Sequence, residues 1–413
     1  MQPLINKIQD IRAEFPALER THNGQSVAYF DGPGGTQVPR SVVEAMSDYL
    51  YNHNANTHWG YPTSDETDAL IEEARAAFAD FMNASPDEIV FGQNMSSLTF
   101  HLAHALGRGF SEGDEIVVTE LDHHANVDTW RSLETDRGVI IRVLPMDIET
   151  GQLEIGDLPA LVNKRTKLIA IGAASNAIGT INDVTAVCTL ARESGILSFV
   201  DAVHFAPHAL IDVKAIGCDF LACSSYKFYG PHLGILYGRR SLLESMDFPK
   251  LQPAPNNSPE RVETGTLNHE GIVGAGAAVD FIASLGNGTS RRACLANAFD
   301  EIHLRDKALM TVAWNGLSGI EGVRIYGPGI DARRTSLVSF TVDGHPSRDV
   351  SKALAENGVF VSHGNFYAST VVKRLGIEKQ GLVRAGCSVY TTANDVERLI
   401  EGVRAFVSEH CSP

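Results

Sequence analysis

Hydrophobic and polar positions follow two alternating patterns along most of the chain. Short apolar runs, typical of buried strands, alternate with longer segments whose apolar residues recur every three or four positions, as in amphipathic helices. The predicted strands are residues 27–30, 88–91, 115–119, 139–144, 168–172, 197–200, 220–223 and 233–237. The predicted helices are residues 39–50, 65–83, a segment ending near 106, 124–136 and 184–194. This order predicts an α/β fold with a mostly parallel central sheet covered by helices on both faces.

The pattern changes after a loop rich in proline and asparagine at residues 252–259. An Ala/Gly-rich helix follows at 272–285, and Gly286-Asn-Gly288 marks a boundary. Beyond it we predict a long helix at 291–317, strands at 323–326, 336–342, 359–361 and 382–384, and helices from 348 and from 393. The sequence therefore predicts a large domain (26–286), a smaller C-terminal α/β domain (287–413) and an N-terminal arm (1–25) that packs with the small domain.

Polar side chains gather where the predicted strands end. They lie at residues 94–97, 122–123, 175–176, 201–204 and 224–227. Ligands of parallel α/β sheets bind beyond the carboxyl ends of the strands, so these clusters predict one shared site. The polar, aromatic segment 51–63 either lines the substrate site or is a surface loop. In the glycine-rich turn at residues 31–36, glycines such as Gly35 allow the backbone to approach a ligand closely.

Lys227 is the central candidate for chemistry, because it stands in a short polar turn between two apolar strands. A solvent-exposed lysine at a strand end is the common alternative. Burial disfavours the ammonium form and lowers the pKa, as a Schiff-base lysine requires. Asp201 ends the preceding strand, 26 residues earlier. This pair is typical of a pyridoxal phosphate (PLP) site, in which the lysine forms the imine and the acid keeps the pyridine nitrogen protonated.

The turn at Asn94-Met-Ser-Ser97 leads from a strand into a helix, whose free amides favour an anion. Ordinary helix capping by Asn94 or Ser96 is the alternative. Together with Ser224 and Tyr226 this turn forms a credible cradle for a phosphate monoester. His123 offers a flat ring that stacks on a cofactor, or it is a structural histidine.

Composition narrows the class of protein further. The 413 residues carry a formal net charge of −16, which argues against nucleic-acid binding. No run of 18 apolar residues, polybasic cluster or signal pattern is present, so we expect a cytoplasmic protein without membrane contact. The six cysteines show no zinc-type spacing, and His123-His124 has no partner motif, so no metal site is predicted.

Six motifs occur in the order typical of one family. They are Asp122-His-His-Ala-Asn126, Ser175-Asn-Ala-Ile-Gly-Thr180, Asp201-Ala-Val-His204, Ser224-Ser-Tyr-Lys227-Phe-Tyr-Gly-Pro, Thr264-Gly-Thr-Leu-Asn268 and Val383-Arg384. From about residue 28 to 405 the chain resembles the cysteine desulfurase-like branch of the class V aminotransferase superfamily. The resemblance implies the fold type I architecture of PLP-dependent transferases and a homodimer that acts on an amino acid.

The resemblance also implies roles for individual residues. Lys227 would carry PLP, Asp201 would pair with the pyridine nitrogen, His123 would stack on the ring, and His204 would approach the ring hydroxyl. The phosphate would be held by Ser96, the Met95 amide, Ser224 and Tyr226, and Thr266 would reach the phosphate of the partner subunit. Arg384 would clamp the substrate carboxylate by its bidentate fork, with Asn176 near the substrate.

One departure from the family concerns the loop before Arg384. Desulfurases carry a nucleophilic cysteine there, whereas residues 360–368 of this chain contain none and offer His363, Asn365 and Tyr367. We therefore expect a reaction in which Lys227 takes the α-proton and a carbanion forms at Cα, followed by C–S elimination or sulfinate loss. An aminotransferase or an amino-acid epimerase is the alternative, and a catalytically silent PLP-fold binding protein is the third.

Overall fold

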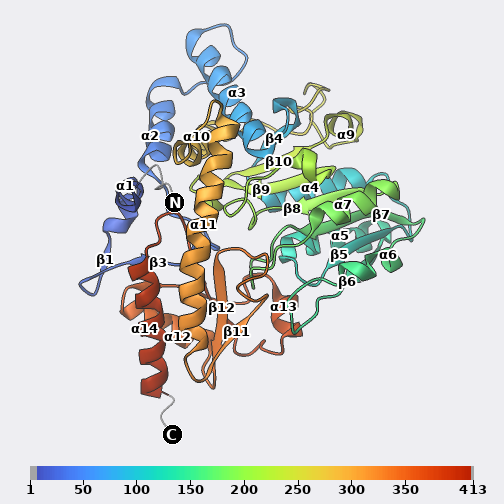
Figure 1. The fold of residues 1–413 in the computed structure, drawn as a ribbon. Coiled ribbons are helices and arrows are strands. Elements are labelled where there is room, and N and C mark those ends of the chain that lie inside the picture. Colours follow the sequence, from blue (N-terminus) through green and yellow to red (C-terminus); the bar gives the residue numbers. More distant parts are fainter. Residues whose placement is uncertain (1–6, 411–413) are drawn as a thin grey trace.

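A seven-stranded sheet forms the centre of the computed structural model, which describes residues 7–410 (Figure 1). Its strand order is β4-β10-β9-β8-β7-β5-β6. The strands are β4 (Ile89–Gly92), β5 (Glu115–Thr119), β6 (Ile140–Leu144), β7 (Thr166–Gly172), β8 (Leu197–Asp201), β9 (Phe220–Ser224) and β10 (Gly234–Gly238). Only β10 runs against its two neighbours, β4 and β9. The predicted mostly parallel α/β sheet is therefore confirmed.

Helices cover both faces of this sheet. Successive strand residues point to opposite faces, and Val117 and Val118 of β5 accordingly belong to different hydrophobic clusters. The first cluster includes α3 (Pro62–Met82), α7 (Val184–Glu193) and α10 (His269–Ser284), and the second includes α4 (Met95–Gly107) and α5 (Asp128–Arg137). The sheet is thus buried on both sides, and its carboxyl-end loops remain as the place for a ligand.

A second, four-stranded sheet lies in the C-terminal part of the chain, with the order β11-β12-β15-β14. Its strands are β11 (Val323–Tyr326), β12 (Leu337–Val342), β14 (Ser362–Gly364) and β15 (Leu382–Gly386). Helices α11 (Arg291–Ser318), α12 (Ser347–Glu356) and α14 (Ala393–His410) pack on it through a separate hydrophobic cluster. Sequence reasoning missed β14, a short strand that brings the loop at 364–368 beside β15.

The N-terminal segment contacts the C-terminal part of the chain. Strand β3 (Ala28–Tyr29) pairs with β13 (Val359–Phe360), and Arg12 of α1 (Ile8–Ala13) donates to the Tyr390 carbonyl at 2.6 Å. The Phe15 ring also packs edge-on against Tyr390, with 4.9 Å between the centroids. Residues 1–6 of the predicted arm lie outside the described residues, and the arm itself stays a prediction. The division into three domains stays a prediction.

One helix is longer than its pattern predicts. Helix α2 (Arg40–Asp48) continues as a π-helical turn at Tyr49–His53, inside a segment that the sequence leaves as a loop from residue 51. Tyr49 is buried there, and its hydroxyl lies 3.1 Å from His269 Nδ1, a tertiary contact that no local pattern reveals.

The remaining elements are short connections. They are β1 (Thr21–His22), β2 (Gln25–Ser26), α6 (Leu158–Leu161), α8 (Val213–Ile216), α9 (Arg240–Ser245) and α13 (Ser369–Arg374), with 3₁₀ turns at Pro16–Glu19, Pro86–Glu88, His124–Asn126, Ile155–Asp157 and Ser225–Lys227. Within residues 7–410, no helix has the length and apolar character needed to cross a membrane.

Candidate active site

A cavity of about 860 Å³ opens at the carboxyl ends of the parallel strands. Its walls come from the loops after β5, β7, β8 and β9, the N-terminus of α4, the turn at residues 31–36, and β15. Most of the predicted site residues line it, namely Met95, Ser96, His123, Asn176, Asp201, His204, Ser224, Tyr226, Lys227 and Arg384. Segments almost 300 residues apart in the sequence thus meet in one site.

Lys227 ends the 3₁₀ turn that follows buried strand β9. Its Nζ donates to the carbonyl oxygens of Pro33 at 2.7 Å and Gly34 at 2.9 Å, and lies 4.6 Å from the centre of the Tyr226 ring. Burial, together with the nearby Arg384 charge, lowers the pKa of Lys227 to about 7. A large share of this amine is therefore neutral, and nucleophilic, near neutral pH.

Asp201 and His204 lie at and just beyond the end of β8. The Asp201 Oδ1 accepts from the Val203 amide at 2.9 Å, and burial raises the pKa of Asp201 to about 6. His204 Nε2 lies 2.9 Å from Thr335 Oγ1, whose hydroxyl also reaches the Gly179 carbonyl. The second ring nitrogen of His204, Nδ1, donates or accepts according to the tautomer. This Nδ1 is buried without a partner.

Sequence reasoning gave no role to Asp122, a second buried acid of the cavity. Its Oδ1 accepts from the Gly172 amide at 2.6 Å, and its Oδ2 accepts from Asn126 Nδ2 at 3.2 Å. Burial and the neighbouring Asp201 hold the pKa of Asp122 well above its usual range. A neutral Asp122 does not repel the charge of Asp201. The sequence feature that could have identified Asp122 as a site residue is its position in a polar cluster at a strand end. Burial and the Lys227 charge also lower the pKa of His123 to about 4, so this ring is neutral.

Another part of the cavity wall is built around the N-terminus of α4. The Asn94 side chain caps the helix by accepting from the Ser97 amide, and the Met95 amide donates to Ser224 Oγ at 3.0 Å. The Tyr226 ring stacks on His232 with 4.7 Å between centroids. His232 lines the cavity and was missed, because a histidine in a Gly-Pro turn carries no sequence signal of its own. Amides, hydroxyls and an imidazole at a helix N-terminus form an anion site.

Arg384 of β15 faces the cavity from the side opposite the α4 helix. Its Nη1 donates to the Asn176 carbonyl at 2.7 Å and its Nε donates to Ser362 Oγ at 3.2 Å. The Phe366 ring lies 4.0 Å from the guanidinium carbon, and the Phe366 carbonyl accepts from Asn176 Nδ2 at 2.9 Å. The nearest carboxylate oxygen, on Asp31, is 3.9 Å away. The guanidinium is held in place without a close ion pair, as a clamp for an incoming carboxylate requires.

Comparison with known proteins identifies this architecture. The aminotransferase class-V family model matches residues 28–399. The chain belongs to this family. Cysteine desulfurases of Pectobacterium carotovorum and Yersinia pseudotuberculosis are each 33% identical to it, over 96% of this chain and 97% of the relative. The class-V aminotransferase family and these desulfurases depend on PLP, so this chain is a PLP-dependent enzyme of the cysteine desulfurase-like kind.

Solved structures agree. The apo cysteine desulfurase of Thermococcus onnurineus NA1 has a TM-score of 0.87 at 30% identity, covering 97% of this chain and 98% of that chain. The Escherichia coli cysteine desulfurase CsdA has a TM-score of 0.86 at 26% identity, covering 98% and 99%. The predicted fold type I architecture is confirmed.

The cavity of this class-V family member fits PLP. The anion site at the α4 N-terminus suits the phosphate, and the unpartnered His204 Nδ1 suits a hydrogen bond with the ring hydroxyl. Asp201 suits a protonated ring nitrogen, and neutral His123 offers an uncharged ring for stacking. The amine of Lys227 suits a covalent imine bond to the aldehyde of PLP.

The lowered pKa of Lys227 predicts how fast the cofactor-free enzyme captures PLP at different pH. The folded-state pKa lies below the ordinary lysine value, so the amine becomes neutral as pH rises through about 7. We expect the second-order rate constant of capture, followed by absorbance, to rise about tenfold per pH unit below this point and to level off above it. A rate that keeps rising to pH 10 would contradict a desolvated Lys227.

Two predicted substrate residues in the loop before Arg384 do not line this cavity, and their role stays a prediction. His363 and Asn365 are exposed and do not line the cavity; Phe366 and Tyr367 do. Ser362 faces Arg384 across the β14–β15 pair, so the next residue, His363, points to the opposite side. Phe366 and Tyr367 both have positive φ angles, 54° and 56°, and both line the cavity, where Tyr367 stands at the edge because it is 75% exposed.

Two further predicted residues also lie outside the cavity walls. Gly35 does not line the cavity, and an added Cβ there would come within 3.3 Å of the Tyr226 ring, so its lack of a side chain lets the turn pack closely on this ring. Thr266 is exposed and does not line the cavity of its own subunit.

No cysteine of residues 7–410 lines the cavity. The thiol of Cys387 comes closest in sequence to Arg384, yet it is buried 3.7 Å from the sulfur of Met310. Burial raises the pKa of Cys387 well above its usual range, so the reactive thiolate is disfavoured.

Proposed function

We propose that this enzyme cleaves the Cβ–S bond of a sulfur-bearing amino acid by elimination or by loss of sulfinate, without a persulfide on a cysteine. The observation that carries the proposal is the cavity wall at residues 366–367. Tyr367 lines the cavity in the loop where desulfurases have their nucleophile, and no cysteine among the described residues does. A Cβ–S cleavage in which sulfur leaves directly needs no enzyme thiol.

Each residue has a defined task in this reaction. Bound PLP supplies an electron sink for the charge that develops at Cα. Arg384 binds the substrate carboxylate, and Lys227, as a neutral amine, removes the proton from Cα. Asp201 balances the positive charge of the protonated ring nitrogen. In the eliminating case the Cβ–S bond then breaks with its electron pair on sulfur, which takes up a proton and leaves as a thiol, and the remaining three-carbon unit is hydrolysed to pyruvate and ammonia. In the desulfinating case the electron pair stays on Cβ, which takes up a proton to give alanine, and sulfur leaves as SO2, which water converts to sulfite.

Product analysis separates this proposal from the alternatives. PLP-loaded enzyme would be incubated with cysteine, S-methylcysteine, cysteine sulfinate and alanine. Release of a thiol with pyruvate and ammonia, or of sulfite with alanine, is the expected result. Conversion to an oxo acid with loss of the cofactor aldehyde would indicate an aminotransferase, inversion at Cα an epimerase, and no turnover a binding protein.

Tyr367 gives a sharper test, because a departing thiolate needs a proton and the Tyr367 phenol is a donor in this wall. General acid catalysis contributes about 10²–10⁴-fold. We expect Tyr367→Phe to lower kcat for a thiol-releasing substrate by about 10²-fold or more, with unchanged PLP affinity. Sulfinate, which leaves without a proton, should be affected much less. The control is Tyr29→Phe, at a half-buried side chain on β3 that does not line the cavity. Equal losses for both substrates would contradict this role.

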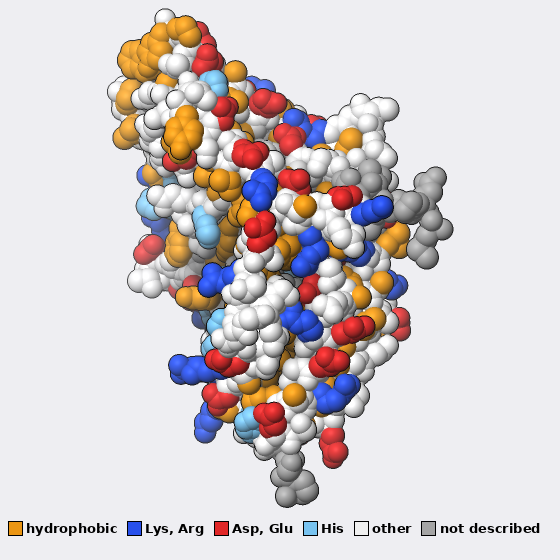
Figure 2. Space-filling model, turned by 90° about the vertical axis from the view of Figure 1, so that its left-hand side faces the viewer, with side chains coloured by type: hydrophobic (Ala, Val, Ile, Leu, Met, Phe, Trp, Pro, Cys, Tyr) orange, Lys and Arg blue, Asp and Glu red, His pale blue; other side chains and the backbone are white. Residues whose placement is uncertain are grey.

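We also propose that the enzyme is a homodimer. Several large apolar side chains near α2 and α3 are exposed and form the orange surface at the top of Figure 2. They include Val43, Leu50, Tyr51, Trp59 and Tyr61. Thr266 is exposed and does not line the cavity of its own subunit, so in a homodimer it is available to bind the PLP phosphate of the partner subunit. Sedimentation equilibrium should give twice the chain mass of 44.6 kDa, and a monomer at micromolar concentration would contradict the proposal.

A further inference from the structure

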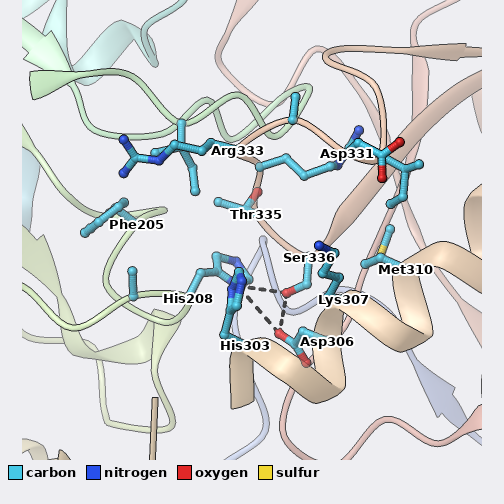
Figure 3. Close-up of a pocket in the computed structure, with 15 residues that line it drawn as sticks. Phe205, His208, His303, Asp306, Lys307, Met310, Asp331, Arg333, Thr335 and Ser336 are labelled. Atoms are coloured by element: carbon cyan, nitrogen blue, oxygen red, sulfur yellow. Dashed lines mark hydrogen bonds and ion pairs between the residues drawn. The ribbon is translucent and has the colours of Figure 1, made fainter. Parts of the chain in front are cut away.

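A short segment before β12 reaches from the C-terminal part of the chain to the active site. Its residues Thr335 and Ser336 are buried, and Figure 3 shows them between the turn after β8 and helix α11. The Thr335 amide donates to the Gly179 carbonyl at 2.9 Å, and the Ser336 carbonyl accepts from the Cys387 amide at 2.7 Å. Backbone bonds therefore hold this segment in place, and its two hydroxyl groups are not needed for that purpose.

The hydroxyl of Thr335 contacts a histidine of the active-site wall. It lies 2.9 Å from His204 Nε2, and the exposed fractions of the two residues are only 1% and 4%. Burial holds the pKa of His204 well below its usual range, so the ring is neutral and carries a single proton. With Nε2 bonded to Thr335, the ring nitrogen left for another group is Nδ1, which is buried and has no partner within residues 7–410.

A second side chain, His208, restricts the tilt of the His204 ring. The two imidazoles meet edge to face, with 5.0 Å between their centroids and 70° between their planes. His208 is itself held in place, because its Nδ1 lies 2.9 Å from Ser336 Oγ, which donates to Asp306 Oδ2 at 2.6 Å (Figure 3). Burial lowers the pKa of His208 to about 3, so no positive charge arises beside His204. A hydrogen bond and a packed ring thus fix the orientation of His204.

A fixed His204 ring matters for PLP because Nδ1 is the atom that suits the ring hydroxyl. This hydrogen bond forms in either tautomer, since Nδ1–H donates to a deprotonated hydroxyl and a bare Nδ1 accepts from a protonated one. A ring that turned about its Cβ–Cγ bond would lose the contact. When the protein holds the ring beforehand, the entropy of ordering it is not lost on binding, and the affinity for the ligand is higher.

We propose that Thr335 is a positioning residue for PLP, whose hydroxyl holds His204 so that Nδ1 meets the ring hydroxyl of the cofactor. Thr335 does not line the active-site cavity, so its influence on the cofactor passes through His204. The proposal rests on the predicted pairing of His204 with the ring hydroxyl. It does not depend on which reaction the enzyme catalyses.

Thr335→Val tests this role, because it removes the hydroxyl, nearly keeps the shape of the side chain and leaves the backbone bond to Gly179 in place. We expect the Kd of PLP, measured by equilibrium dialysis with the cofactor-free enzyme, to rise about threefold to tenfold, as for one lost hydrogen bond. The absorption spectrum of the bound cofactor should change as well, since it reports the protonation of the ring hydroxyl. Thr335→Ser restores a hydroxyl and should return both measurements to the wild-type result.

A double-mutant cycle separates positioning from a general loss of stability. His204→Phe removes the nitrogen that Thr335 positions, so adding Thr335→Val to it should leave the Kd of PLP unchanged. The matched control is Thr341→Val, at a buried threonine of β12 whose hydroxyl lies 3.3 Å from the Tyr326 hydroxyl and which does not line the active-site cavity. This control should keep the Kd and the spectrum of wild type.

Three results would each overturn the proposal. The first is a Thr335→Val enzyme with the Kd and spectrum of wild type, and the second is a loss that Thr335→Ser does not restore. The third is an equal effect of Thr335→Val with and without His204→Phe, since the threonine would then act independently of His204. Thermal unfolding of the cofactor-free variants checks the fold, and Thr335→Ala replaces Thr335→Val in the same comparisons if the valine variant does not fold.

Discussion

Lys227→Ala is expected to abolish turnover and to leave an enzyme that binds PLP without a covalent link. The amine is both the attachment point and the base at Cα, and the cavity holds no second lysine. Loss of the base alone costs about 10²–10⁴-fold in kcat. Borohydride reduction followed by mass spectrometry should fix PLP to wild type at residue 227 and leave the variant unmodified.

The control for this variant is Lys379→Ala, which removes an exposed lysine far from the cavity. It should keep full activity and full labelling. Thermal unfolding of both cofactor-free variants checks the fold. Replacing a desolvated Lys227, whose pKa is lowered to about 7, removes a buried charge and should not unfold the protein. Residual turnover above about a tenth of wild type would show that another group performs the proton transfer.

Asp201→Asn is expected to have the second largest effect, a fall in kcat of about 10²-fold or more. The amide oxygen can still accept from the Val203 amide, so the turn after β8 keeps its shape. It cannot balance a positive charge, and the ring nitrogen then loses its proton more easily. Each tenfold in rate corresponds to about 1.36 kcal/mol of transition-state stabilisation, so the loss would be about 2.7 kcal/mol or more. Single-turnover kinetics of Cα deprotonation measure it directly.

Asp349→Asn, at an exposed position on α12, is the matched control and should leave kcat unchanged.

A related variant tests the role of Asp122. If neutral Asp122 preserves the charge of Asp201, then Asp122→Asn should keep most of the activity, because the amide can still accept from Gly172 and is uncharged. Full activity of Asp201→Asn would contradict the assigned pairing with the ring nitrogen.

The sequence by itself determined the central sheet, the lysine and the acid. Because both faces of a parallel sheet are buried, its strands are continuous apolar runs. Polar residues therefore occur mainly at the strand ends. Lys227, Asp201 and the α4 turn follow from this local rule, and the order of the motifs added Arg384, His123 and His204. The patterns of β14 and of the π-helical turn at Tyr49–His53 were too short or too polar to predict.

Only the tertiary structure decided which side chains near Arg384 face the substrate. Alternation along β14 turns His363 away, whereas Phe366 and Tyr367, in a turn with positive φ, line the cavity wall, which composition cannot reveal. The same holds for Asp122 and for His232, which line the cavity together with residues from distant segments of the chain. Local sequence fixes secondary structure through short-range sterics and burial, whereas a pocket depends on long-range packing between segments that share no local pattern.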